Sequence, residues 1–432
     1  MGASKFTAKE WDASGAIHCY GVMDLRSFVV EVCTAEPVRG DILQKAVDKA
    51  LERLSYYRQT LVRKGSLFYY ADNDLPFVVA ESAEPRRVGG ATTNYHMVDV
   101  VYHDATISFS MHHGFCDGLG LNRFIEAVLY HYFCMKDGKA YSDEGIYTDN
   151  VPFDPAETVD AFEEKTDADV NELRALAGGA PRYRVPELDE PDGKGPTMHR
   201  LPLKIKADDL LAWCKANSSS PAATISAFMA RAVARENDVR EGVIMSVAPI
   251  SLRAFLGADK TFKNCSAAAF MPIDAADARE KPVGELAAAA RQKLKTQMGE
   301  GTGRLLSVSI NMITHMGKKV PTFFLKTKIL SMPQTRPQDT FYMDYVGSLT
   351  TNDYADQITD VHYLNADPCG GSFFVLTSAT AGYFHVSLSQ TFASDRYYKA
   401  LCAVLDEQGL PYEQLPRETY LNPVVEQPVR VR

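Results

Sequence analysis

The sequence has no uninterrupted apolar run long enough to cross a bilayer, and residues 1–20 contain no basic start followed by an apolar stretch. It also has no excess of positive charge, because its formal net charge is −9. Binding to a nucleic-acid backbone requires clustered Lys and Arg, so this charge argues against a nucleic-acid surface. These absences predict a cytoplasmic protein with no membrane span and no nucleic-acid partner.

The eight cysteines form no CxxC pair and show no spacing typical of a zinc site. We therefore expect thiols in a reducing compartment, most of them small buried apolar residues. No short-period repeat, heptad array or low-complexity tract is present, which excludes a solenoid or a coiled coil. With 432 residues, 46% of them hydrophobic and 23% charged, the chain is typical of a folded protein too long for one compact core.

Hydrophobic periodicity predicts that strands and helices alternate along most of the chain. In the first half, the expected strands cover residues 28–33, 67–70, 77–80, 95–102 and 106–112, and the expected helices cover 41–54 and 121–138. In the second half, the expected strands cover 203–205, 242–249, 373–380 and 383–390, and the expected helices cover 207–216, 224–235, 284–298, 305–316 and 395–406. Asp41 is expected to cap the first helix.

Residues 151–200 differ from their surroundings, because they are acidic and rich in Pro and Gly. Such a composition is typical of a crossover between domains. We therefore expect an α/β protein with a first lobe at 1–150, a crossover at 151–200 and a second lobe at 201–432.

The stretch from Ile107 to Gly120 carries the residues with chemical potential, at the point where a strand leads through a tight turn into a helix. Strand alternation points His112 and His113 toward opposite faces. A histidine at a strand end can face a cleft while the backbone around it fixes its ring. Neutral imidazole can then accept a proton from a hydroxyl or amine that attacks a carbonyl, which contributes about 10² to 10⁴ in rate.

Three other interpretations apply to the same stretch. Asp117 could orient the histidine or cap the helix, and we favour a structural role in which it binds backbone donors or a buried arginine. A metal site is not expected, because the two histidines point apart and no further ligand cluster is evident. Cys116 is interpreted as a packing residue rather than a nucleophile.

The segment from His112 to Gly118, with the sequence HHGFCDG, resembles the HHxxxDG signature of the chloramphenicol acetyltransferase and condensation-domain superfamily. Weaker similarities follow along most of the chain. Residues 57–61 lie where the family has an arginine-bearing segment, and residues 252–253 with 262–265 resemble a later asparagine-containing motif. Residues 344–347 look like a strand-and-glycine segment of alcohol acetyltransferase-like members.

This resemblance implies two chloramphenicol-acetyltransferase-like lobes that form a pseudo-dimer around a central tunnel. It implies that His113 is the general base and that Asp117 is a structural acid paired with an arginine, for which Arg58 and Arg63 are the candidates. It also places Gly118 as a small residue beside the tunnel. The DFGWG segment of plant acyltransferases is absent, so that subfamily is not expected.

The resemblance further implies transfer of an acyl group from a thioester to a small-molecule alcohol or amine. Acyl-CoA is the preferred donor, and no permanently bound cofactor is expected. One alternative is a free-standing condensation domain that uses a phosphopantetheine thioester on a separate acyl or peptidyl carrier protein. A second alternative is a catalytically silent binding module of the same fold.

Overall fold

A computed structural model describes most of the chain. The residues that it describes are 6–11, 27–162, 181–189, 197–299, 303, 305–306, 319–331, 339–365, 373–423 and 425–431. Most of the helix expected at 305–316 and parts of the crossover expected at 151–200 therefore lie outside the described residues. Within the described residues, no helix is both long enough and apolar enough to cross a membrane.

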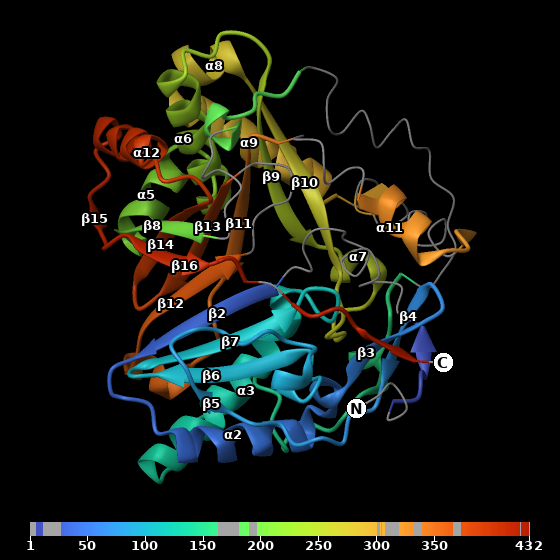
Figure 1. The fold of residues 1–432 in the computed structure, drawn as a ribbon. Helices are drawn as coiled ribbons and strands as arrows, with labels where there is room; N and C mark the ends of the chain where they lie inside the picture. Colours follow the sequence, from blue (N-terminus) through green and yellow to red (C-terminus); the bar gives the residue numbers. More distant parts are fainter. Residues whose placement is uncertain are drawn as a thin grey trace.

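The first lobe is built on a sheet whose strand order in the described residues is β12-β2-β7-β6-β5. Its elements are β2 (Ser27–Thr34), α2 (Gly40–Arg53), η1 (Ser55–Arg58), β5 (Ala80–Glu81), η2 (Ala91–Thr93), β6 (Val98–His103), β7 (Thr106–His112), α3 (Gly118–Asp137), η3 (Pro155–Thr158), η6 (Asn352–Gln357) and β12 (Ile358–Asn365). Alternate residues of β2 and β7, such as Val30 and Phe109, are buried in one core with α2 and α3. Figure 1 shows these helices along one side of the sheet.

Most of these elements agree with the periodicity of the sequence, but two expectations are wrong: the strand at 77–80, of which only Ala80 lies in a strand, and the cap of α2. The helix begins at Gly40, its N-cap is Arg39, and no side chain caps it, so that Asp41 lies inside the first turn. A Cβ atom on Gly40 would overlap the ring of Tyr102. The close approach of that ring explains why a glycine starts the helix.

The second lobe contains a larger mixed sheet, with the order β10-β9-β11-β13-β14-β8-β15 and β16 paired to β8 in the described residues. Its elements are η4 (Pro186–Asp189), β8 (Thr197–Lys206), α5 (Ala207–Ala216), α6 (Pro221–Glu236), β9 (Val243–Ser251), α7 (Arg253–Leu256), β10 (Ser266–Asp274), α8 (Ala275–Glu280), α9 (Val283–Gln297), α11 (Phe323–Ser331), β11 (Phe341–Gly347), β13 (Phe373–Thr380), β14 (Tyr383–Gln390), α12 (Arg396–Glu407), β15 (Tyr412–Gln414) and β16 (Glu418–Leu421). A second hydrophobic core joins this sheet to α5, α6, α9 and α12.

Two late strands cross to the first part of the chain, which a division at residue 200 does not predict. β12 pairs antiparallel with β2, and β17 (Val429–Val431) pairs parallel with β3 (Thr60–Lys64). β3 belongs to a small sheet of order β1-β4-β3-β17, completed by β1 (Glu10–Trp11) and β4 (Leu67–Ala71). The two lobes are therefore interlocked by main-chain hydrogen bonds as well as by side-chain packing.

Candidate active site

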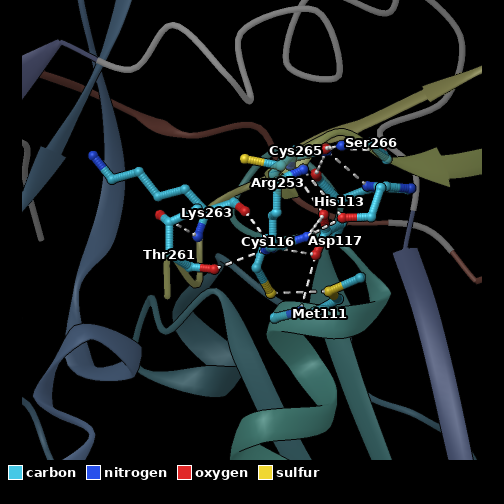
Figure 2. A network of polar contacts seen from close by, with 12 residues as sticks. Met111, His113, Cys116, Asp117, Arg253, Thr261, Lys263, Cys265 and Ser266 are labelled. Atoms are coloured by element: carbon cyan, nitrogen blue, oxygen red, sulfur yellow. Dashed lines mark hydrogen bonds and ion pairs between the residues drawn. The ribbon is translucent and has the colours of Figure 1, made fainter. Parts of the chain in front are cut away.

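The HHGFCDG segment lies where the end of β7 and the start of α3 meet the loop between α7 and β10 of the second lobe (Figure 2). His112 ends β7 and is fully buried. Its Nδ1 accepts a hydrogen bond from the Gly114 N–H at 3.0 Å. Burial, together with the adjacent His113, lowers the pKa of His112 to about 3. His112 is therefore a neutral residue that holds the turn, whereas His113 is partly exposed.

Asn264 of the second lobe contacts His113 across the junction between the lobes. Its Nδ2 donates a hydrogen bond to the main-chain oxygen of His113 at 3.2 Å and lies 3.4 Å from the ring Nδ1. The Oδ1 of Asn264 accepts hydrogen bonds from Ser266 N and Oγ, at 3.0 and 2.8 Å, which fix the orientation of the amide. The Phe28 ring of the first lobe is tilted relative to the imidazole, with the two ring centroids 6.4 Å apart. Both lobes therefore position His113.

Asp117 is buried and accepts four hydrogen bonds from three segments. Its Oδ1 accepts from Gly120 N at 2.9 Å, as an N-cap of α3, and from Arg253 Nη2 at 2.8 Å. Its Oδ2 accepts from Arg253 Nη1 at 2.7 Å and from Cys265 N at 3.0 Å. This bidentate pair joins the first turn of α3 to the second lobe, as Figure 2 shows.

Arg253 is buried with all its donors engaged. Besides Asp117, its guanidinium donates to the main-chain oxygens of Thr261 at 3.0 Å and Lys263 at 2.8 Å, and to Ser251 Oγ at 3.4 Å. Burial acts to lower the pKa of Arg253, but the Asp117 carboxylate raises it overall. Arg253 therefore stays charged, and its pair with Asp117 holds the loop that carries the contacts to the motif.

The expectation that Arg58 or Arg63 pairs with Asp117 is wrong. Arg58 is exposed at the end of η1, and the Arg63 guanidinium lies 3.9 Å from the centre of the Phe323 ring. The partner is Arg253, which is 136 residues from Asp117 in sequence. The signal in the sequence was the similarity of residues 252–253 and 262–265 to the asparagine-containing motif, which places both Arg253 and Asn264 in this site.

Two glycines near the motif have different structural roles. Gly118 is partly exposed, and a Cβ there would meet Val346 Cγ1 at 3.6 Å and Phe28 Cε1 at 4.0 Å, which are ordinary contacts. A Cβ on Gly120 would overlap the main-chain oxygen of Phe262. Gly120 is therefore the residue that allows α3 to touch the second lobe, a requirement that sequence reasoning missed.

Cys116 is fully buried, and its Sγ donates toward Met111 Sδ at 3.1 Å. Burial raises the pKa of this thiol well above its usual value, so it stays protonated and is not a nucleophile. Among the described residues, no group of three or more His, Cys, Asp or Glu side chains could hold a metal ion. The chemistry of the site therefore centres on the His113 imidazole.

No protein-family model matches the chain, and no curated protein matches its sequence. Solved structures do match over almost the whole length. TRI101 of F. sporotrichioides, complexed with coenzyme A and T-2, is 12% identical with a TM-score of 0.65, and the match covers 94% of this chain and 99% of that chain. Polyketide synthase associated protein 5 from Mycobacterium tuberculosis is 13% identical with a TM-score of 0.65, over 93% and 98% of the two chains.

The trichothecene 15-O-acetyltransferase TRI3 from Fusarium sporotrichioides is 10% identical with a TM-score of 0.59, over 93% of this chain and 97% of that chain. At such identities the likeness concerns the fold. The mixed α/β fold of two acyltransferase-like lobes, expected from the HHxxxDG resemblance, is confirmed.

Proposed function

We propose that this protein is an acyltransferase that moves an acyl group from acyl-CoA to a hydroxyl or amine of a small molecule, with His113 as the general base. The observation that carries the proposal is the placement of His113. It is a partly exposed imidazole at the junction of the lobes, contacted by Asn264 of one lobe and Phe28 of the other. TRI101 bound to coenzyme A and the acetyltransferase TRI3 have the same fold, which supports a thioester donor.

In the proposed reaction, the acceptor oxygen or nitrogen attacks the thioester carbonyl while the His113 imidazole removes its proton. The tetrahedral intermediate then collapses, the carbon–sulfur bond breaks, and the imidazolium returns the proton to the leaving thiolate. The ion pair between Asp117 and Arg253 takes no part in proton transfer. Its role is to hold the turn and the Asn264 loop in register, so that the ring is placed before substrate arrives.

We test the proposal by measuring free thiol release and product mass with a panel of acyl-CoA donors and pooled alcohol and amine acceptors. The His113→Ala variant should lower acceptor-dependent transfer by about 10² to 10⁴. His103→Ala is the matched control, because His103 is an exposed histidine at the end of β6. Equal transfer by His113→Ala and the unchanged chain would contradict the role of His113.

The same assay separates the donor classes. If acyl-CoA is the donor, transfer proceeds without any added protein. Transfer only from an acylated carrier protein would favour the free-standing condensation domain, and absence of transfer from both would favour a silent binding module. The proposal also includes the passage of substrates between the two lobes. It keeps the lobe boundaries at 1–150 and 201–432.

A further inference from the structure

Near the proposed catalytic centre, polar side chains from three elements, β11, β12 and α3, lie close to one another. Asp344 is on β11, where it pairs with Leu376 of β13. Ser378, two residues further along β13, donates a hydrogen bond from its Oγ to the main-chain oxygen of Val361 in β12, at 3.0 Å. Because side chains two residues apart share a face, Asp344 lies on the face of the large sheet that packs against β12.

The end of β11 adjoins the HHGFCDG segment, at an irregularity of the strand between Tyr345 and Gly347. Val346 follows Asp344 by two residues, about 7 Å of strand, and its Cγ1 would be 3.6 Å from a Cβ on Gly118. The Phe28 ring lies 5.7 Å from the Tyr363 ring of β12 and 6.4 Å from the His113 ring, between centroids. Asp344 and Tyr363 therefore border the same small region as His113.

Several buried polar atoms of this region have incomplete hydrogen bonding. Among the described residues, Asn122 Oδ1 and Glu126 Oε2 have no hydrogen-bond partner, and Tyr363 Oη, in a side chain only 3% exposed, has none beyond the neighbouring Asn122 side chain. Glu126 Oε1 accepts from Thr350 N at 2.9 Å, and its Oε2 has a 3.6 Å ion-pair contact with Arg123. Leaving a buried polar atom without a partner is costly, which points to a ligand group that supplies donors.

Asp344 adds a carboxylate to this region and is partly exposed. It forms no hydrogen bond or ion pair with any residue in the described part of the chain. Burial raises the pKa of Asp344 to about 7, because the loss of solvation disfavours the charged carboxylate. Burial and the charges of Asp344 and Glu126 raise the pKa of Tyr363, whereas a hydrogen bond with the Asn122 side chain acts to lower it. These acceptors match the protons of an ammonium group.

We propose that Asp344, together with Tyr363 and Asn122, binds a protonated amino group of the acceptor and so selects amine-bearing acceptors. This inference rests on the proposed function. The ammonium group would donate hydrogen bonds to the Asp344 carboxylate, the Tyr363 oxygen and the Asn122 Oδ1. The reacting hydroxyl or second amine of the same molecule would then reach His113, across the region bordered by Phe28.

The test uses three acceptors with the same six-carbon chain, hexanol, hexanediol and aminohexanol, with acetyl-CoA as donor. We expect kcat/KM for aminohexanol to exceed that for hexanol, and Asp344→Asn to lower it by about tenfold to hundredfold. The same variant should lower transfer to hexanol far less, because hexanol has no ammonium group for the Asp344 carboxylate to bind. Tyr363→Phe should cause a smaller selective loss. Asp356→Asn, the same substitution at an exposed carboxylate in η6, should change none of the rates.

A second measurement, calorimetric binding of aminohexanol to the full chain without donor, separates this inference from the proposed function. Binding that Asp344→Asn weakens would support the site even if no acetyl transfer occurred. Equal losses for all three acceptors would overturn the inference, since they would show a structural role for Asp344. Equal use of hexanol and aminohexanol by the unchanged chain, with no selective binding, would overturn it as well.

Discussion

The buried pair of Asp117 and Arg253 yields the sharpest prediction about stability. Asp117→Asn keeps an oxygen for the Gly120 N–H, but it removes the charge and places an amide N–H₂ group against the donors of Arg253 or Cys265. The Arg253 side chain is 5% exposed, so its charge stays buried without a counterion. Breaking a buried pair in this way costs about 3–5 kcal/mol.

Urea unfolding of the full chain measures this loss, followed by circular dichroism and by fluorescence so that separate unfolding of the lobes would be seen. Arg253→Met and the double variant complete a cycle. The double variant should be less destabilised than the sum of the single variants, because the uncompensated charge is gone.

Asp154→Asn is the matched control for the same reasoning. Asp154 also caps a helix start, that of η3, and pairs with Lys260 at 2.6 Å, but at the surface. Its substitution should cost about 1 kcal/mol or less. A cost of that size for Asp117→Asn as well would refute the conclusion that the buried carboxylate holds the lobes together.

Two further predictions concern the neighbouring residues. Gly120→Ala should destabilise the fold by about 1–3 kcal/mol, because the new methyl group overlaps Phe262. The free energy of unfolding of Gly118→Ala should stay within about 1 kcal/mol of that of the unchanged chain. Similar urea midpoints for both variants would contradict the close approach at Gly120. The usual pKa of an Asp carboxyl is 3.8, and in the folded chain the pKa of Asp344 is about 7. Between these two pH values Asp344 is protonated in the folded chain and ionised in the unfolded chain. Between about pH 4 and pH 8 the unchanged chain should therefore lose on the order of 2–4 kcal/mol of stability relative to Asp344→Asn. Tyr363, which interacts with Asp344, and Glu126, which interacts with Tyr363, are acidic groups present in both chains. A stability difference that does not vary with pH would therefore contradict this prediction.

The sequence predicts the local parts of the site because they depend on neighbouring residues. The change of period from strand to helix places β7, the turn and α3 within a few residues of their observed bounds. The spacing of His113 and Asp117 across that turn likewise depends only on the chain between them. Where local reasoning failed, as for Asp41, a distant ring decided the start of the helix.

What only the tertiary structure decided are the contacts between residues far apart in the chain. Asp117 meets Arg253 and His113 meets Asn264 across 136 and 151 residues, and no periodicity or propensity encodes such pairings. The crossing of β12 to β2, and the position of Asp344 beside Tyr363, follow from the same long-range packing. The sequence by itself determined the local conformation of the turn, because that conformation depends on the residue types within the turn. The packing of the two lobes determined which partners they meet, because burial and hydrogen bonding are satisfied only in the assembled fold.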